Sequence, residues 1–485
     1  IQSEGDSPDA LAAIPHLSRK DLSPEPEIIH RQLEDLMGLP ALCHDIYTNG
    51  ISYIDLAFPL DNLPLEDYQW IPFFTRAVIS VGLPGMDYAE VSSLLARTVG
   101  GLNVILHTGS AAGGGSPIIE TPSGEFDLVG RDWIIYRLKC LDEKTAASLD
   151  LALRLISEAD FSDLRRIHDL VMEMKNGVRS SLAPNGHHYA SSRANRYASA
   201  SAQTDETWNG LTQLLFVHRL AGMDAAVIAD KLKNLRDTLA SGGLIASLAG
   251  SAGALKSGGK LLAGRFKGFG PPKNRMPGKI VSGAIPAPEV FASPSLQVGF
   301  AAMTLRAAEY DTLAQAAETA LAHQLSTGAL WENIRMKGGA YGASASSNNL
   351  ERCFSLSTYR DPNPLRSLES FSVILKDSAA HAGGLAKGDD LEKMIIGCYA
   401  SETRPRTPSE KTVNDLLRFL SRIDDDCRRR KLDRLINICE DDISAALREL
   451  ASQLASQKPQ VVIAGMNSAE QAAKALGAEV QLLPV

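Results

Sequence analysis

The segment Ile334-Arg335-Met336-Lys337-Gly338-Gly339-Ala340-Tyr341-Gly342, followed later by Tyr359-Arg360-Asp361-Pro362, decides how this chain is interpreted. Arg335 offers a planar fork of donors that can hold a carbonyl or a carboxylate, and Tyr341 offers one hydroxyl on a rigid ring. Gly338 and Gly339 lie between them and let a backbone approach closely. Both side chains are suited to donate to an oxyanion. A glycine-rich bend with an exposed arginine and a half-buried tyrosine is the alternative, and spacing alone does not separate the two interpretations.

The surroundings of this segment occur twice in the chain. The matching segments, in chain order, are 46–58 with 290–302, Gly100-Gly101 with Gly338-Gly339, 133–142 with 352–361, and 244–252 with 461–469. The difference in residue number between matching segments falls steadily along the chain, as deletions from surface loops of the second copy would cause. A repeat of this length is a duplicated domain. We therefore predict an α+β fold with two homologous domains, each an antiparallel-rich sheet with helices packed on one face, and with the strands at Ile51 and Leu296 in equivalent places.

Length and composition agree with two domains. A chain of 485 residues exceeds the size at which a single core stops growing. We expect residues 1–40 to be a linker from an upstream half, 41–262 the first domain, 263–278 a Gly/Pro-rich linker and 279–485 the second domain. An apolar content of 44% and a charged content of 22% are typical of a soluble protein, and no apolar run is long enough to span a membrane.

Charge and cysteines exclude several classes of function. The net charge of −8 argues against nucleic-acid binding. The one basic run, Arg428-Arg429-Arg430-Lys431, follows three aspartates in an expected helix, which favours a solvated helix face over a phosphate site. The six cysteines show no C-x-x-C spacing, so buried thiols are favoured over disulfides or zinc ligands.

With these residues in view, the chain resembles the C-terminal half of the pitrilysin-type zinc peptidases, in the branch of presequence protease and falcilysin. The resemblance covers essentially the whole chain. It implies a pitrilysin-like metallohydrolase fold of four homologous domains, whose two halves close around unfolded peptides. It also implies that the first of these four domains, in the N-terminal half, binds zinc through His-x-x-Glu-His, and that the fourth of them, residues 279–485 here, supplies an arginine and a tyrosine. By this resemblance Tyr341 would donate to the tetrahedral intermediate, and Arg335, Gly338 and Gly339 would bind the substrate.

The chain departs from a complete peptidase in its histidines. Two zinc ligands on one helix must lie four residues apart to share a face. No two of the ten histidines have that spacing. We therefore expect no metal or cofactor in this chain and place the zinc in an N-terminal half. His187-His188 is interpreted as a surface pair on a loop.

Three neighbouring motifs have local interpretations. The glycine-rich stretch 109–116 lacks the Gly-Lys-Ser/Thr ending of a phosphate loop and predicts a hairpin loop. The segment Asp361-Pro362-Asn363-Pro364 predicts the start of a helix. For Arg360, pairing with an internal carboxylate is favoured over substrate contact.

Two functions remain open. The favoured one is the substrate-binding half of a zinc-dependent oligopeptidase, inactive until joined to its zinc-bearing half. The alternative is a non-catalytic peptide-recognition or scaffolding subunit of a pitrilysin-type heterodimer. The expected partners are the zinc-bearing half and unfolded peptides, with no nucleic acid and no membrane span. The expected location is cytoplasmic in a bacterium or an organellar matrix in a eukaryote.

Overall fold

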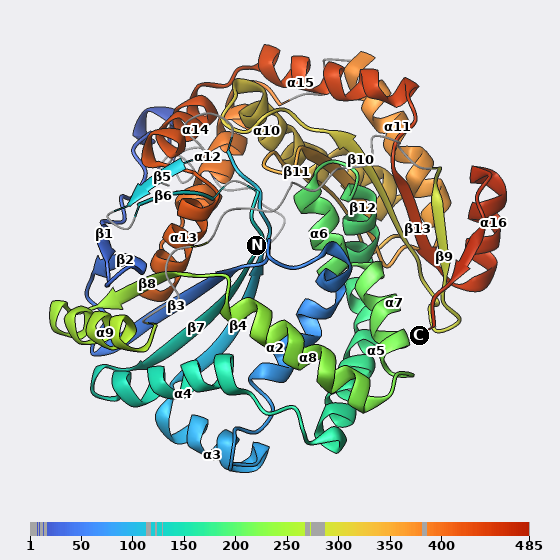
Figure 1. The fold of residues 1–485 in the computed structure, drawn as a ribbon. Coiled ribbons are helices and arrows are strands. Elements are labelled where there is room, and N and C mark those ends of the chain that lie inside the picture. The colour runs from blue at the N-terminus through green and yellow to red at the C-terminus, as the bar shows by residue number, and fades with distance from the viewer. Residues whose placement is uncertain are drawn as a thin grey trace.

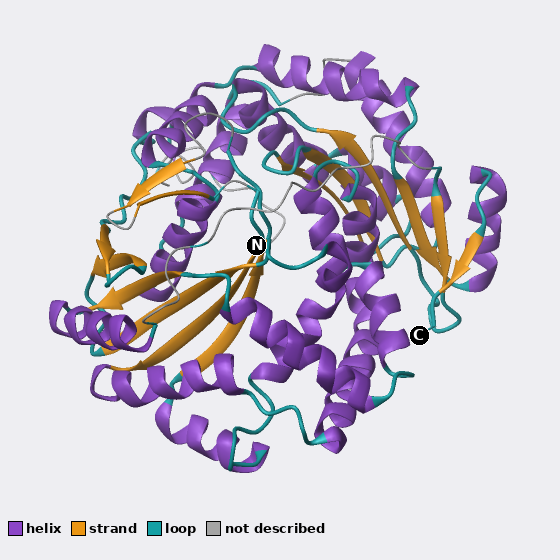
Figure 2. Ribbon diagram, in the orientation of Figure 1, coloured by secondary structure: helices purple, strands orange, loops and turns teal. Residues whose placement is uncertain are grey.

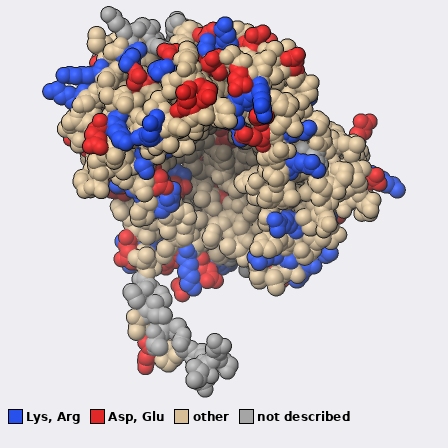
Figure 3. All heavy atoms as spheres, turned by 90° about the horizontal axis from the view of Figure 1, so that it is seen from below, with Lys and Arg blue, Asp and Glu red and all other residues tan. Residues whose placement is uncertain are grey.

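Two six-stranded sheets with helices around them form the body of the protein (Figures 1 and 2). The computed structural model describes residues 7, 9, 13, 17–112, 118–121, 124–128, 130–266, 272, 287–380 and 386–484. The face drawn in Figure 3 is hollowed at its centre, and acidic and basic side chains are intermixed around the hollow.

The first sheet has the strand order β1-β2-β8-β3-β7-β4. Its strands are β1 (Gln32–Asp35), β2 (Pro40–Asp45), β8 (Ile245–Gly250), β3 (Ile51–Pro59), β7 (Trp133–Leu141) and β4 (Gly101–His107). The pair β2 and β8 is parallel and the other neighbours are antiparallel. The long pairing of β3 with β7 joins two segments rich in β-branched and aromatic residues, which fit a pleated, buried surface. A separate hairpin pairs β5 (Ile118–Thr121) with β6 (Gly124–Asp127).

The second sheet has the order β11-β12-β10-β13-β9-β14. Its strands are β11 (Gly342–Asn348), β12 (Cys353–Tyr359), β10 (Phe300–Arg306), β13 (Gln460–Ala464), β9 (Glu289–Ala292) and β14 (Val480–Leu482). Read from the other end, five strands repeat the order and directions of the first sheet, from β2 to β4. The predicted duplicated α+β fold is therefore confirmed. The prediction was wrong in one detail. The strand of the second sheet that is equivalent to β3 is β10, which begins at Phe300, and Leu296 lies in the preceding turn.

The helices follow the repeat in part. In the first half they are η1 (Arg19–Asp21), η2 (Leu65–Trp70), α2 (Ile71–Val78), α3 (Tyr88–Thr98), η3 (Asp142–Lys144), α4 (Thr145–Glu158), α5 (Leu164–Asn195), α6 (Ala200–Asn209), α7 (Leu211–Leu220), α8 (Ala225–Ala240) and α9 (Ala252–Arg265). In the second half they are α10 (Leu313–Thr327), η4 (Trp331–Met336), α11 (Pro364–Ala380), α12 (Asp389–Thr403), α13 (Pro408–Leu420), α14 (Asp425–Asn437), α15 (Glu440–Ser452), η6 (Gln453–Ala455) and α16 (Met466–Leu476).

The long helix α5 crosses from the first domain onto the sheet of the second. It contacts β10, β12 and β13, and its residues share an apolar cluster with Phe300 and other residues of that sheet. Gly186 makes the contact possible, because a Cβ atom at this position would lie 2.2 Å from the Phe300 ring. Asn195, at the end of α5, accepts hydrogen bonds from Thr304 Oγ1 (2.6 Å) and Ser355 Oγ (2.7 Å). The crossing thus fastens the two domains together.

A second helix makes the reciprocal crossing. Helix α13 of the second domain packs on the first sheet, where Leu416 and Phe419 join a buried cluster with Trp133. Arg137, on β7, donates to the Ser409 carbonyl at 3.1 Å and pairs with Asp55 at 2.7 Å. Each sheet therefore carries its own helices on one face and a helix of the other domain on the opposite face. The expectation of helices on one face was incomplete for this reason.

The predicted linker 1–40 contains folded structure. Strand β1 extends the first sheet, so that sheet begins before residue 41. Upstream of β1 the chain lies against the second domain: Arg19 donates to the Ile438 carbonyl at 2.9 Å, and Tyr399 donates to the Ser23 carbonyl at 2.9 Å. The first described residues therefore connect both domains. Residues 263–265 of the predicted linker 263–278 belong to α9, and most of the remaining linker lies outside the described residues.

The cysteine prediction is largely confirmed. Five of the six cysteines are buried and Cys439 is exposed, and all six are free thiols. Within the described parts of the chain, none of the helices has both the length and the apolar character needed to cross a bilayer.

Our first prediction tests the crossing of α5. Gly186→Ala should lower the free energy of unfolding by ~1–3 kcal/mol, because the added methyl group overlaps a ring that is itself fully buried. Gly177→Ala, in the same helix with no atom within 4 Å of the added Cβ, should be neutral or stabilising by up to ~1 kcal/mol. Denaturant unfolding of both variants measures the difference. Equal effects at the two positions would contradict the crossing.

The second prediction concerns His107, which lies at the end of β4 and meets Ser421 Oγ of the second domain at 3.2 Å. Burial lowers the pKa of His107 from 6.5 to about 4. Between these two pKa values the unfolded chain binds a proton at His107 and the folded chain does not. The free energy of unfolding should therefore fall as the pH drops from about 6.5 to about 4, by about 3 kcal/mol at most.

Denaturant unfolding between about pH 7 and pH 4 checks this prediction. His107→Asn should reduce the slope of that pH dependence without abolishing it, because burial also lowers the pKa of His44 and of His187. The exposed His218→Asn should keep the slope of the unmodified chain. A His107→Asn variant with an unchanged slope would show that His107 does not contribute.

Candidate functional site

The Arg335 segment is a π-helical turn that leads into the edge strand of the second sheet. Helix η4 covers Trp331–Met336, and β11 begins directly after Tyr341. Ile334 and Ala340 are buried in the domain core, whereas the following residue in each case, Arg335 or Tyr341, is exposed. The two apolar residues thus anchor the turn, and the two polar ones project from it. Single π-helical turns are frequent at functional sites.

The two glycines have a structural role in this turn. A Cβ at Gly338 would lie 2.5 Å from the Ile334 carbonyl oxygen, and Gly339 has a φ of +82°, which other residues rarely adopt. The Gly339 amide donates to the Arg335 carbonyl at 3.1 Å, and the Ala340 amide donates to the Ile334 carbonyl at 3.1 Å. The glycines therefore shape the turn that presents Arg335 and Tyr341.

The two predicted functional side chains lie together. The Arg335 guanidinium carbon is 5.8 Å from the centre of the Tyr341 ring, within the range of a cation–π contact. The Tyr341 amide donates to the Arg360 carbonyl at 3.2 Å, which fixes the backbone beside the end of β12. Tyr341 is 66% exposed, and Trp331 and Met336 of the preceding π-helical turn are also exposed. An exposed arginine and an exposed phenol therefore lie side by side.

A row of rings continues from Tyr341 into the first domain. Tyr341 packs edge-on against Tyr359 at 5.7 Å, Tyr359 packs edge-on against His187 at 4.9 Å, and His187 lies 4.2 Å from His188. Both histidines belong to α5, and burial lowers the pKa of His187. Because α5 lies across β12, a helix of the first domain packs against Tyr359, the ring that contacts Tyr341.

Sequence reasoning missed this row. The histidine pair was interpreted as a surface pair on a loop, and the loop was wrong: α5 continues through Pro184, Gly186 and both histidines. Proline normally breaks a helix interior, but here packing on the second sheet holds the helix together. Tyr359 was seen in the sequence and given no role, and a contact with residue 187 leaves no signal in a single sequence.

The end of β12 turns sharply into α11. Asp361 is buried and exchanges two backbone hydrogen bonds with Gly299 (2.7 and 2.8 Å), and its Oδ1 accepts from the Asn363 amide at 2.8 Å. Helix α11 begins at Pro364, which confirms the predicted helix start. Arg360 lies over the Tyr359 ring at 5.3 Å. The carboxylate partner expected for Arg360 does not occur among the described residues.

The described residues do not fit a zinc ion. Within the parts of the chain that the structure describes, no three His, Cys, Asp or Glu side chains come together as a metal site needs. His187 and His188 have no third ligand of this kind beside them. The glycine-rich stretch 109–116 lies partly outside the described residues.

Two family models match the chain. A model for the region associated with M16 peptidases of subfamily C matches residues 1–220, and one described as "PreP C-terminal domain" matches residues 296–466, which include Arg335 and Tyr341. The chain is 26% identical over 447 residues to presequence protease 1, chloroplastic/mitochondrial, of Arabidopsis thaliana, covering 90% of this chain and 39% of that protein. It is also 26% identical over 477 residues to the mitochondrial presequence protease of Gibberella zeae, covering 95% and 45%. The chain thus spans less than half the length of these relatives.

Solved structures agree in fold. The peptidase M16 inactive domain from Pseudomonas fluorescens matches with a TM-score of 0.61 and 12% identity, over 90% of this chain and 98% of that one. Pitrilysin matches with a TM-score of 0.60 and 11% identity, over 94% of this chain and 46% of its own.

Our third prediction concerns metal content. The purified chain, dialysed against buffer with equimolar zinc, should retain well under one zinc ion per chain, because no suitable ligand set is present among the described residues. Elemental analysis measures the ratio. One tightly held zinc ion per chain, removed by a chelator with loss of thermal stability, would contradict the prediction.

Proposed function

The chain belongs to the pitrilysin-type peptidases, where it corresponds to the C-terminal half of the presequence proteases, and we propose that it is the peptide-binding half of a zinc-dependent oligopeptidase. In this proposal a separate N-terminal half, covalently joined or not, holds the zinc. Unfolded peptides bind between the halves. This chain supplies Arg335 and Tyr341 to the bound peptide.

The observation that carries the proposal is the exposure of Tyr341 next to Arg335. A tyrosine that served only the core of its domain would be buried, with its hydroxyl bonded inside the protein. Tyr341 instead leaves most of its ring outside the domain, and no hydrogen bond from its hydroxyl group occurs among the described residues. The hydroxyl is therefore free to donate to a group that comes from outside.

The chemistry of the two side chains supports different roles. Hydrolysis of a peptide bond places negative charge on the former carbonyl oxygen, and a donor aimed at that oxygen stabilises the transition state. Tyr341 suits this role because it offers one hydroxyl donor at the end of a rigid ring. Arg335 suits a neighbouring carbonyl of the peptide, since its fork of donors can hold the backbone in register before and during the reaction.

The contacts that hold Tyr341 in position also suit its role as a donor. Donors contribute most when they are held in position before the reaction, because no reorganisation is then needed. The Tyr359 ring fixes one edge of Tyr341, the Gly338-Gly339 turn fixes its backbone, and α5 holds Tyr359 from the other side. The peptide therefore meets a rigid surface.

Our fourth prediction tests these roles in the enzyme reassembled from this chain and its zinc-bearing half. Tyr341→Phe should lower kcat by about 100- to 1,000-fold and change KM by no more than a few fold, because the lost hydrogen bond forms mainly in the transition state. Arg335→Ala should raise KM as well, since a peptide carbonyl is also held in the ground state. Steady-state kinetics with an unstructured peptide give both constants.

Tyr88→Phe is the matched control, because Tyr88 is also partly exposed but lies on α3 of the first domain, under Arg166. It should leave both constants unchanged. Full activity of Tyr341→Phe in a correctly folded, reassembled enzyme would reject the catalytic role and favour a scaffolding subunit.

A further inference from the structure

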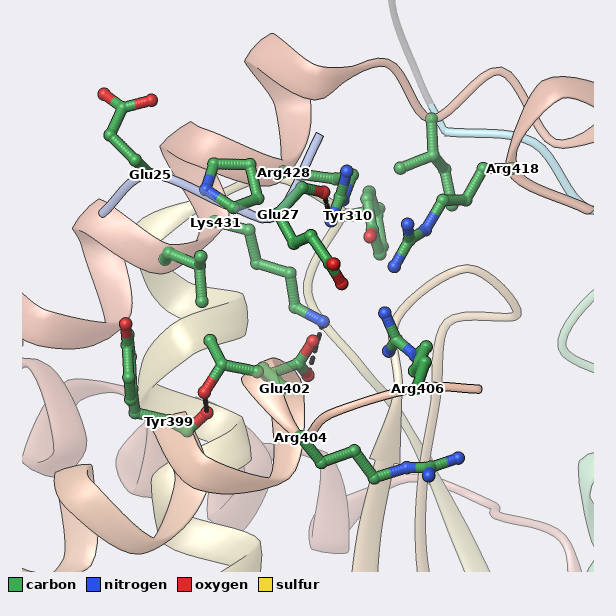
Figure 4. Close-up of a pocket in the computed structure, with 14 residues that line it drawn as sticks. Glu25, Glu27, Tyr310, Tyr399, Glu402, Arg404, Arg406, Arg418, Arg428 and Lys431 are labelled. Atoms are coloured by element: carbon green, nitrogen blue, oxygen red, sulfur yellow. Dashed lines mark hydrogen bonds and ion pairs between the residues drawn. The ribbon is translucent and has the colours of Figure 1, made fainter. Parts of the chain in front are cut away.

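A cationic cavity lies away from the Arg335 site, between the N-terminal segment and three helices of the second domain (Figure 4). Residues 25–27 form one wall, and the end of α12, the following segment and helices α13 and α14 form the others. Its volume is about 210 Å³, far more than the ~10–15 Å³ that one water molecule needs. Its charged side chains are Glu25, Glu27, Glu402, Arg404, Arg406, Arg418, Arg428 and Lys431.

Positive charge is in excess in this cavity. Five cationic side chains face three acidic ones, although the chain as a whole carries a net charge of −8. Two of the cations belong to the basic run on α14, for which the sequence predicted a solvated face. The structure corrects that prediction for two of the four residues: the side chains of Arg428 and Lys431 are only 12% and 20% exposed and line the cavity, whereas those of Arg429 and Arg430 are 40% and 51% exposed.

Three of the cations have partners. Arg404 pairs with Glu410 at 2.9 Å, and Lys431 pairs with Glu402 at 2.7 Å. Arg428 pairs with Asp425 at 2.6 Å and also donates to the Glu27 carbonyl at 2.9 Å.

The other two arginines lack such partners. Nε of Arg406 and Nη1 of Arg418 are shielded from solvent, and the described residues offer neither atom a hydrogen-bond acceptor. Figure 4 shows both guanidinium groups directed toward the middle of the cavity. Asp415 lies near Arg418, but its carboxylate pairs with Arg31 at 2.7 Å.

The surroundings of Arg418 oppose its charge. Burial, together with nearby Arg428 and Arg406, lowers the pKa of Arg418 to about 10. A buried donor without an acceptor destabilises the fold, and a buried charge without a counter-ion does so more strongly. An anion in the cavity would relieve both costs.

We propose that this cavity binds a small oxyanion of the phosphate class, either free phosphate or the phosphate group of a small molecule, with Arg406 and Arg418 as its main ligands. Two guanidinium groups without an ion-pair partner match the charge of a phosphate group, about −1.5 to −2 at neutral pH. Each guanidinium fork also fits phosphate oxygens two at a time. A single carboxylate would leave one positive charge unmatched.

Binding would act on the connection between the domains. Glu27 accepts hydrogen bonds through its carbonyl from Arg428 and through its carboxylate from Lys411. The oxyanion would join Arg418 of α13 to Arg406 of the segment before α13, beside residues 25–27. Occupancy would therefore stabilise the part of the second domain on which the N-terminal segment lies, and this effect is independent of the peptidase proposal.

The test measures thermal unfolding of the full 485-residue chain in millimolar inorganic phosphate, against sodium chloride of equal ionic strength, with calorimetric titration for the dissociation constant. The proposal predicts a saturable rise in Tm, because a ligand that binds only the folded state stabilises it. Arg418→Gln and Arg406→Gln should each weaken phosphate binding by about 10- to 100-fold. Lys474→Gln, which removes the same charge from exposed α16, should bind as the unmodified chain does.

Two further ligands identify the source of the anion. Glycerol phosphate binding at least as tightly as inorganic phosphate assigns the site to a phosphate ester, and weaker binding assigns it to free phosphate. No saturable rise with either, or a rise that both arginine variants retain, would overturn the proposal. Equal binding of succinate would overturn the assignment to the phosphate class. Circular dichroism of each variant confirms that it is folded, and if one arginine variant fails to fold, the other carries the test.

Discussion

The close contact of α5 with the second sheet is the constraint on which the rest of the structure depends. A helix of the first domain can lie against β10 here only because Gly186 has no side chain to meet the Phe300 ring. Close packing of this kind leaves little room for two domains to shift against each other. With α13 crossing in the opposite direction, each domain completes the core of the other. The two domains are therefore joined by shared buried clusters and not by a linker alone.

The candidate site uses this rigidity. Tyr341 and Arg335 project from a turn of the second domain, but the ring beneath them, Tyr359, is held from the other side by His187 of the first. A peptide that met Tyr341 would press against a surface built by both domains. The cationic cavity is likewise built from segments far apart in the chain, because residues 25–27 form one wall and the helices around Arg418 form another. Both places are built by contacts between distant segments of the chain.

The sequence predicts the parts of this structure that depend on local pattern. The duplicated sheets follow from recurring strand and glycine patterns, and Arg335 and Tyr341 follow from their motif. The crossing of α5 could not be predicted, because Pro184 and Gly186 signal a break unless the sheet that supports the helix is known. The role of Tyr359 and the partial burial of Arg428 are likewise long-range. A single sequence records which residues are present but not which distant residues they meet.

The central claim is that Tyr341 faces a peptide held between this chain and a second half. Site-specific photo-cross-linking tests it most directly. A photoreactive phenylalanine analogue at position 341, in the reassembled enzyme, should become attached to a labelled unstructured peptide, and unlabelled peptide should suppress the reaction. The same analogue at Val373, which is exposed on α11, should give no specific product. Equal labelling from both positions, or none from position 341 in an enzyme that still binds the peptide, would contradict the account.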